Sequence, residues 1–273
     1  MTNFFRVLTL VFIIWFPSAV NAQTKEATPF VLGKVEQIQS IELGEQRTFN
    51  VYLPEGYSPD SALRYPVIYL LDGSVDEDFI HVAGLVQFCS FPWVNILPKT
   101  IVVGIANHDR RRDFTFPTTV EKDKKDFPTT GASAKFIAFL EKEVQPFVDR
   151  NYKTNKHKTL IGQSLGGLLA TEILFKKPHL FNQYVIVSPS LWWDNESLLT
   201  TKRQPLTSST KVFVAVGKEG KVMESDAKSL FELLKKEDSG FLKTLYHYLP
   251  DENHATIYHQ ALYEAFVQLQ KVH

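Results

Sequence analysis

The sequence predicts an α/β fold, in which a mostly parallel sheet carries helices on both of its faces. Two observations lead to this prediction. Short runs rich in valine, isoleucine, leucine and tyrosine recur along the chain, and most are nearly continuously apolar, as in a sheet covered on both faces. Segments with apolar residues at helical spacing lie between the later runs. Strand and helix therefore alternate, which is the order of a doubly wound parallel sheet.

Seven runs are predicted to be strands, at 46–54, 65–73, 100–107, 158–163, 183–190, 211–218 and 242–250. The first alternates apolar and polar residues, which is typical of a half-exposed antiparallel strand. Apolar residues at helical spacing predict helices within 136–148, 230–234 and 261–269. The segment 107–130 is long, charged and contains proline, so we expect a surface loop there.

The first 22 residues have the features of a secretory signal. Arg6 supplies a positive start, the run Val7–Phe16 is too short to span a bilayer, and small residues permit cleavage after Ala22. We therefore expect an exported protein, periplasmic or secreted, with no stable membrane insertion after cleavage. Residues 23–273 then form a single domain. The alternative is an uncleaved membrane anchor.

Composition excludes several classes of partner. The 30 basic and 30 acidic residues balance and form no long basic run, so a nucleic-acid partner is not expected. The single cysteine, Cys89, cannot form an internal disulfide, and its apolar setting predicts a core residue rather than a nucleophile. The chain has no H-E-x-x-H motif and no paired C-x-x-C, so we expect neither a metal nor a cofactor. The oligomeric state is left open.

One short stretch, "LIGQSLGGLLA", points to nucleophilic catalysis. The pattern G-x-S-x-G arises easily by chance, but here a buried strand precedes it and a helix follows it. A sharp strand-to-helix turn needs small residues two before and two after the serine, and Gly162 and Gly166 occupy those positions. The helix start also favours a negative oxygen. We predict Ser164 as a nucleophile; the alternative is an inert serine in a tight glycine turn.

A serine hydroxyl needs a base to become a good nucleophile. In this architecture the acid and then the histidine follow the serine along the chain. His254 lies in "PDENHATIY", a polar turn between the last predicted strand and the last predicted helix, and we predict that it is the base. His247 lies within a strand, where a structural role is expected, and His259 falls on the surface of the last helix.

The acid must orient the histidine and stabilise its protonated form. Glu219 follows the strand 211–218 directly and is the first choice. Glu224, Asp226 and Asp194 remain alternatives, and so does a site with no acid at all.

Two backbone amides are expected to bind the developing oxyanion. The amide of Leu165, next to the nucleophile, is one. The other is expected from "YLLDGS", where the amide of Gly73 or Ser74 lies in the loop after an earlier strand.

Trp192, Trp193 and Arg110 are predicted to lie on the substrate side. The tryptophans follow the carboxyl end of a strand, where α/β sheets bind ligands, and the arginine suits an anionic group. The alternative is that the tryptophans pack a lid, while Arg110 and the two arginines after it pair with aspartates of the same loop.

Several segments together resemble the putative-esterase branch of the α/β-hydrolases, which includes esterase D-like proteins and the ferric enterobactin esterases. The resemblance runs from about residue 35 to 270 and rests on "LLDG", "NHDRRRDFT", "FIAFLEKEVQPFVDRNYKT", "LIGQSLGGLLA", "IVSPSLWWDN" and "PDENHA". It implies an α/β-hydrolase fold, with Ser164 and His254 as nucleophile and base, and hydrolysis of ester bonds without a metal. The stretch "GKEG" departs from the more acidic sequence usual there, so the role of Glu219 stays open.

The expected function is that of a serine esterase acting on a small-molecule ester through an acyl-enzyme. One alternative is a siderophore esterase that opens a catecholate trilactone. Another is a non-catalytic binding protein on a hydrolase scaffold. The sequence does not indicate the acyl or alcohol group.

Overall fold

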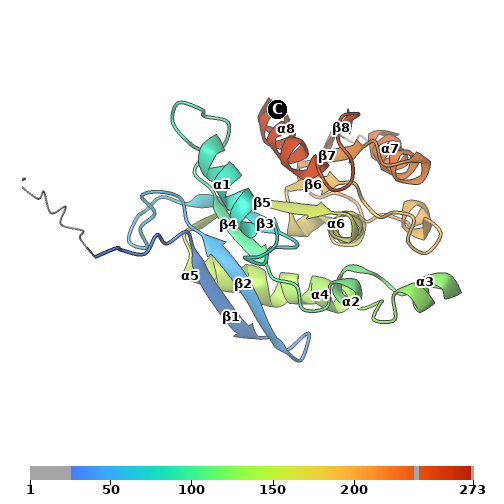
Figure 1. Ribbon diagram of the computed structural model, residues 1–273, viewed down its shortest axis with the longest axis horizontal. Helices are drawn as coiled ribbons and strands as arrows, with labels where there is room; N and C mark the ends of the chain where they lie inside the picture. The colour runs from blue at the N-terminus through green and yellow to red at the C-terminus, as the bar shows by residue number, and fades with distance from the viewer. Residues whose placement is uncertain (1–25, 237–239, 272–273) are drawn as a thin grey trace, which may run out of the picture. The chain divides into compact units, whose positions relative to one another are not determined.

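The computed structural model describes residues 26–236 and 240–271, and the chain divides into two units. In the first unit, Met1–Val31, the described residues 26–31 form neither helix nor strand. The predicted signal at 1–22 lies outside the described residues. The second unit, Leu32–His273, contains every strand of the sheet (Figure 1).

The sheet has eight strands in the order β1-β2-β4-β3-β5-β6-β7-β8. The strands are β1 (Lys34–Gln39), β2 (Gln46–Tyr52), β3 (Tyr65–Leu70), β4 (Ile101–Ile105), β5 (Thr154–Gln163), β6 (Gln183–Val187), β7 (Thr210–Gly217) and β8 (Leu242–Leu249). Strand β2 is antiparallel to both of its neighbours, and all other pairings are parallel. The predicted mostly parallel sheet is confirmed.

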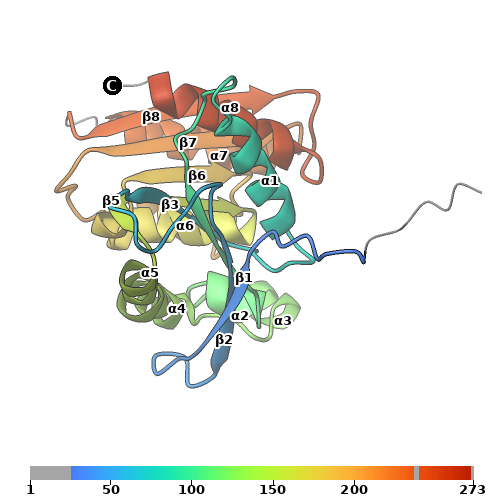
Figure 2. The ribbon, with the colours of Figure 1, turned by 90° about the vertical axis from the view of Figure 1, so that its left-hand side faces the viewer.

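Helices cover both faces of the sheet (Figure 2). On one face lie α1 (Phe79–Cys89) and α8 (Ile257–Lys271), and on the other lie α4 (Ser133–Phe139), α5 (Gln145–Asn151), α6 (Leu165–Lys176) and α7 (Lys221–Lys236). Because both faces are buried, the central strands need apolar side chains at every position, which explains their continuous apolar runs.

Helices α6 and α7 differ in how they bury their residues. Helix α6 is buried from Leu165 to Phe175, since it lies between the sheet and further helices. Helix α7 buries one stripe that includes Ala227, Leu230 and Leu234, which recur at helical spacing. The helical pattern seen in the sequence around 230–234 is this stripe.

The segment 107–130 is more ordered than the predicted surface loop. It contains two short helices, α2 (Arg110–Phe114) and α3 (Glu121–Asp126). The Asp109 side chain caps α2 by accepting a hydrogen bond from the Arg112 amide. The Trp193 indole donates to the Phe116 carbonyl at 2.9 Å, so the segment is attached to residues that follow β6. The predicted surface loop therefore contains two short helices that the sequence pattern did not indicate.

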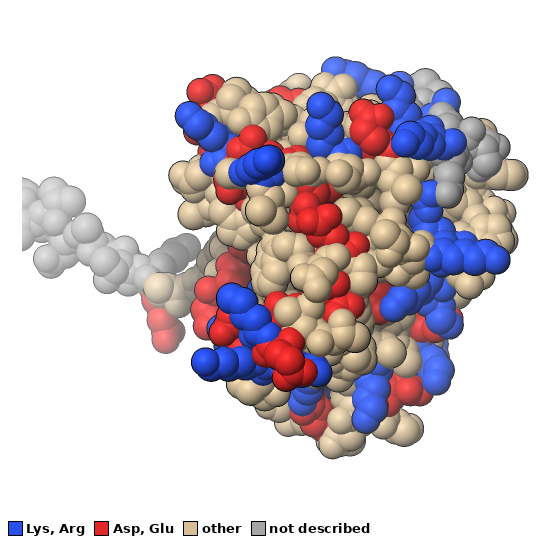
Figure 3. Space-filling view, turned by 90° about the vertical axis from the view of Figure 1, so that its right-hand side faces the viewer, with Lys and Arg blue, Asp and Glu red and all other residues tan. Residues whose placement is uncertain are grey.

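Burial of Cys89 is complete, and it raises the pKa of the thiol to about 11. The expectation of a core cysteine is confirmed. On the face drawn in Figure 3, basic and acidic side chains are interspersed with uncharged ones. Within the described part of the chain, we find no helix with the length and apolar character needed to cross a bilayer.

Candidate active site

Ser164 lies at the junction of β5 and α6 in an unusual backbone conformation, with φ 58° and ψ −119°. A positive φ is uncommon for a residue other than glycine and costs free energy. Neighbouring backbone groups hold the turn. The Ser164 amide donates to the Val187 carbonyl at 3.0 Å, and the Ser164 carbonyl accepts from the amides of Leu168 and Ser190.

The glycines around Ser164 permit a close approach of strand and helix. A Cβ atom at Gly162 would lie 2.4 Å from the Gly166 carbonyl oxygen, and one at Gly167 would lie 2.9 Å from Pro189 Cα. No side chain fits at these distances. The glycines therefore keep the turn sharp enough to present the serine at its tip.

His254 and Glu219 meet at the same edge of the sheet. Their Nδ1 and Oε2 atoms lie 2.5 Å apart. Glu219 is two residues beyond β7, and His254 is in the turn between β8 and α8. A Cβ atom at Gly217 would lie 2.5 Å from the Glu252 carbonyl oxygen, so this glycine lets the two loops come together.

Hydrogen bonds fix the carboxylate of Glu219, whose side chain is 2% exposed. Its Oε1 accepts from the Ser188 hydroxyl at 2.5 Å and from the Gly217 amide at 3.0 Å. Burial by itself raises the pKa of Glu219, but the hydrogen bonds from His254, Ser188 and Gly217 outweigh it, so that the pKa is lowered. Glu219 is therefore an anion at neutral pH.

The turn that carries His254 is also tied to the strand that carries Ser164. The Gln163 side-chain amide donates to the His254 carbonyl at 2.6 Å, and Gln163 directly precedes Ser164. The His254 side chain remains 47% exposed. Ser164, His254 and Glu219 thus come from three loops at one sheet edge, where the carboxyl ends of parallel strands meet.

Comparison with known proteins agrees with this geometry. The model of the family described as "Putative esterase" matches residues 40–263. The chain belongs to the putative esterase family. The resemblance seen in the sequence is confirmed, and so is the α/β-hydrolase fold.

Relatives of this family member include the ferri-bacillibactin esterase BesA of Bacillus subtilis, which is 32% identical over 180 residues. That match covers 61% of this chain and 62% of the relative, so it spans less than two thirds of the relative's length. An IroE-like serine hydrolase from Shewanella oneidensis has 30% identity and a TM-score of 0.78, covering 88% of this chain and 80% of that one. A BES protein from Bacillus cereus has 28% identity and a TM-score of 0.77, covering 90% and 98%.

The alternative acids of this esterase-family chain have other contacts. Glu224 accepts hydrogen bonds from the amides of Glu219 and Gly220, both at 3.0 Å, and so supports the loop that carries Glu219. Asp226 is buried on α7. Asp194 accepts from the Thr119 amide at 2.6 Å and fastens the segment after β6 to the one before α3. Of the four acids considered from the sequence, Glu219 is the one bonded to His254.

The two expected oxyanion donors after β3 differ in their surroundings. The Gly73 amide donates to the Ile105 carbonyl at 2.9 Å and is already used. The Ser74 amide donates to the exposed Glu77 carboxylate at 3.2 Å, a long bond that a substrate oxygen can replace. The Leu165 amide begins α6, where the first backbone N–H groups of a helix have no partner within the helix. Of the two amides expected after β3, that of Ser74 therefore has the weaker bond within the protein.

Arg110 is engaged within the protein. Its guanidinium donates to both carboxylate oxygens of Asp72, at 2.6 and 2.9 Å, and to the Gln163 carbonyl at 3.2 Å. Asp72 itself has a φ of 56° at the turn before Ser74. Arg110 thus connects the Ser74 loop to the strand that leads to Ser164, and its predicted contact with a substrate stays a prediction.

The two tryptophans after β6 have different environments. Trp193 is fully buried, and its indole donates to the Phe116 carbonyl. This agrees with the lid-packing alternative. Trp192 is half-buried, and its ring centroid lies 6.0 Å from that of Phe127. Of the predicted pair, only Trp192 stays available to contact a ligand.

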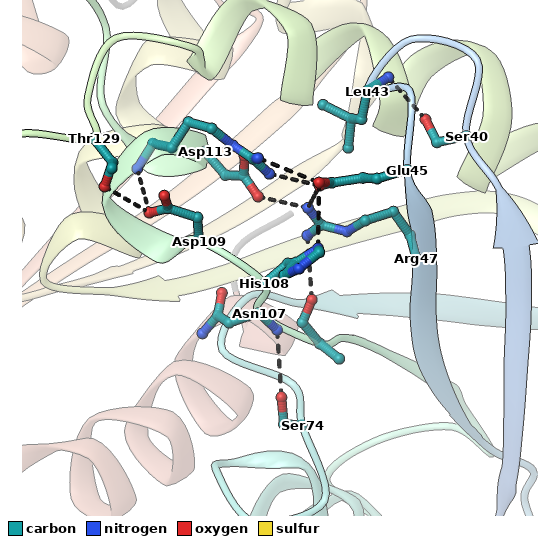
Figure 4. A network of polar contacts seen from close by, with 12 residues as sticks. Ser40, Leu43, Glu45, Arg47, Ser74, Asn107, His108, Asp109, Asp113 and Thr129 are labelled. Atoms are coloured by element: carbon teal, nitrogen blue, oxygen red, sulfur yellow. Dashed lines mark hydrogen bonds and ion pairs between the residues drawn. The ribbon is translucent and has the colours of Figure 1, made fainter.

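A buried ion pair fixes the segment that begins at Asn107 (Figure 4). Arg47 on β2 donates to Asp113 at 2.6 Å, and both side chains are 1% exposed. Glu45 accepts from Arg112 and Arg47; the Arg112 hydrogen bond is the main reason that the pKa of Glu45 falls to about 2. The network ends beside Ser74, whose hydroxyl accepts from the Asn107 amide at 3.3 Å.

Sequence reasoning missed several residues that shape the site. Ser188 and Ser190 stand within the quoted stretch "IVSPSLWWDN" and Gln163 within "LIGQSLGGLLA", but none of the three was given a role. The signal available for the two serines is their position: they follow the strand that lies between those leading to Ser164 and Glu219.

Proposed function

We propose that this protein is a serine esterase in which Ser164 attacks the ester carbonyl, His254 accepts the serine proton and Glu219 orients His254. The bond between Glu219 and His254, at the edge where the strained Ser164 turn ends β5, is the observation that supports this most strongly. A buried carboxylate on one nitrogen of an imidazole leaves the other nitrogen to act as the base.

The proposed reaction has two halves. Attack by Ser164 forms a tetrahedral intermediate, and the amides of Leu165 and Ser74 stabilise its oxyanion. Protonated His254 then donates its proton to the departing alcohol, which leaves an acyl-enzyme. Water activated by His254 releases the acid and restores Ser164. Each step uses only groups of this chain and water.

The test is hydrolysis of a p-nitrophenyl ester by Ser164→Ala. We expect kcat to fall by about 10⁴-fold or more, as for loss of a serine nucleophile in other hydrolases. Ser208→Ala is the matched control, because Ser208 is exposed and the hydrogen bond from the Thr210 hydroxyl uses its backbone carbonyl, which alanine retains. A Ser164→Ala variant with wild-type turnover would show that the nucleophile has been assigned wrongly.

A fluorophosphonate probe separates this proposal from a non-catalytic binding protein. The probe should label wild-type protein at Ser164, because its phosphorus mimics the carbonyl that an activated serine attacks. Folded wild-type protein that stays unlabelled would favour a binding role.

Siderophore hydrolysis is the second candidate for the substrate. A relative is named a ferri-bacillibactin esterase. The exposed Arg111 guanidinium lies 4.9 Å from the centre of the Phe127 ring, and Phe127 contacts Trp192. A cationic and aromatic surface of this kind suits an anionic aryl ester. A panel of short acyl, feruloyl and catecholate trilactone esters, run beside Ser164→Ala, tests it; a kcat/KM for the trilactone below that of the simple esters would reject it.

We also propose that the protein is exported, because its first 22 residues have the order of a secretory signal. The measurement is the mass of the mature protein recovered from the periplasm or medium. Loss of residues 1–22 is expected, and a full-length product in the membrane fraction would contradict it.

A further inference from the structure

The segment Ser188–Pro189–Ser190 lies between two members of the proposed triad. It follows β6, whose neighbours in the sheet are β5, which ends one residue before Ser164, and β7, which ends two residues before Glu219. The three strands are parallel, so their carboxyl ends meet at one edge. A side chain directly after β6 can therefore reach the nucleophile on one side and the acid on the other.

Ser188 faces the acid. Its hydroxyl donates to Glu219 Oε1 at 2.5 Å, while the other carboxylate oxygen contacts His254. Ser188 is fully buried, and its φ of 44° is strained for a residue other than glycine. Glycine would remove this strain but would also remove the hydroxyl. A serine at this position therefore retains a donor to the acid at a cost in backbone free energy.

Ser190 faces the nucleophile. Its hydroxyl oxygen lies 3.2 Å from the Ser164 hydroxyl oxygen, and its amide donates to the Ser164 carbonyl at 3.0 Å. When the Ser190 hydroxyl donates, the Ser164 oxygen is held in place and its own proton is free to point toward His254. Ser190 is 3% exposed, so water does not easily replace it.

Pro189 fixes the spacing between the two serines. Its Cα lies 2.9 Å from where a Gly167 Cβ would be, so the proline packs directly on the first turn of α6. A proline ring also restricts φ near −65°. The rigid proline thus separates the Ser188 hydroxyl, which contacts Glu219, from the Ser190 hydroxyl, which contacts Ser164.

We propose that Ser188 and Ser190 are positioning residues for the reaction, Ser188 acting through Glu219 and Ser190 through Ser164. The inference rests on the proposed function. It adds that one tripeptide after β6 sets the geometry of both the acid and the nucleophile.

The experiment compares kcat and KM of Ser188→Ala and Ser190→Ala for a p-nitrophenyl ester. Each variant should lose about 10- to 100-fold in kcat with little change in KM, because each removes a hydrogen bond to a reacting or charged group. Ser133→Ala is the matched control. It removes an equally buried serine hydroxyl at the start of α4, outside the loops that carry Ser164, Glu219 and His254, and should leave kcat unchanged.

A double-substitution cycle identifies the residue through which each serine acts. In a Glu219→Gln background, Ser188→Ala should lower kcat little further, because the carboxylate through which Ser188 acts is already gone. Ser190→Ala should lower kcat by the same factor in this background as in the wild type. Ser188→Gly, which suits the positive φ, repeats the measurement should Ser188→Ala fail to fold.

Three results would overturn the inference: kcat within about 2-fold of the wild type for folded Ser188 and Ser190 variants, an undiminished Ser188 effect in the Glu219→Gln background, or an equal loss in Ser133→Ala. If Ser164→Ala keeps wild-type turnover, the proposed function fails. If Ser164→Ala is inactive and the other two serines prove neutral, only this inference fails.

Discussion

At the scale of single residues, the sheet edge that carries the proposed triad also carries backbone strain. Ser164 and Ser188 both have a positive φ, and so does Asp72 in the loop of the second oxyanion donor. Aspartate tolerates this conformation better than serine does. Strained residues persist where their surroundings determine them, and the amides of both serines donate hydrogen bonds to carbonyls of the neighbouring strands.

Gly162→Ala should disrupt this turn. The new Cβ would lie 2.4 Å from the Gly166 carbonyl oxygen, and since that atom belongs to the backbone, the turn itself must shift. We expect a loss of about 3 kcal/mol in the free energy of unfolding, at the upper end of overpacking effects, together with loss of ester hydrolysis. Urea denaturation and p-nitrophenyl ester turnover measure the two effects.

Gly84→Ala is the control for the same change at an open position. Gly84 lies within α1, and its Cβ would meet no atom within 4 Å. Alanine there should stabilise the protein by about 0.5–1 kcal/mol, because glycine is a poor helix former. An equal free energy of unfolding for Gly162→Ala and Gly84→Ala would show that the Gly162 site has room for a Cβ atom.

At the scale of elements, helix α7 carries an acid inside its buried stripe. Asp226 is 2% exposed, and its Oδ2 makes no hydrogen bond to a described residue. Burial, aided by the charge of Glu196, raises the pKa of Asp226 to about 6. The folded state therefore binds this proton more tightly than the unfolded chain does, and the contribution of Asp226 to stability falls as pH rises from about 4 to 6.

Asp226→Asn should for this reason stabilise the protein at pH 8 by about 1–3 kcal/mol, and by much less at pH 4. The measurement is urea denaturation at both pH values. Glu232→Gln, which changes an exposed acid on the same helix, should stay within about 0.5 kcal/mol of the wild type at each. A gain from Asp226→Asn that is the same at pH 4 and pH 8 would contradict the assignment.

The elements that sequence patterns predicted well are the buried ones. Strand β6 was predicted to end at residue 190 but ends at Val187, because Ser188 leaves the extended conformation with a φ of 44°. Strand β1 was missed, since four of its six residues are polar or charged. Helix α1 was missed because it is apolar on nearly every side, and periodicity cannot then distinguish a helix from a strand.

The candidate site could be predicted only in part, because some of its contacts join residues that lie far apart in the sequence. Ser164 and His254 follow from the order of strands, turns and helices, and Glu219 from its distance to the end of β7. The contacts of Arg110 with Asp72 and of Ser188 with Glu219 join residues 38 and 31 positions apart. They depend on how loops fold over the sheet edge, and no local pattern encodes that.

At the scale of the whole fold, the sheet separates two hydrophobic clusters. Ile173 on α6 belongs to one, and Ile68 on β3 belongs to the other. Both are buried, and the sheet lies between their clusters. The eight strands form one continuous sheet, and each cluster packs on one face of it. If the sheet comes apart, both clusters are therefore exposed to water. We therefore expect the two clusters to unfold together but to respond independently to small changes in packing.

The pair Ile68→Val and Ile173→Val tests both expectations. Each substitution removes one buried methylene and should lower the free energy of unfolding by about 0.5–1.5 kcal/mol. Since the residues share no cluster, the double variant should lose the sum to within about 0.5 kcal/mol. Urea denaturation followed by both tryptophan fluorescence and far-ultraviolet circular dichroism should give one coincident transition in all three variants. Separate transitions for the two probes would mean that the faces of the sheet unfold independently, and a larger coupling would mean that packing strain crosses the sheet.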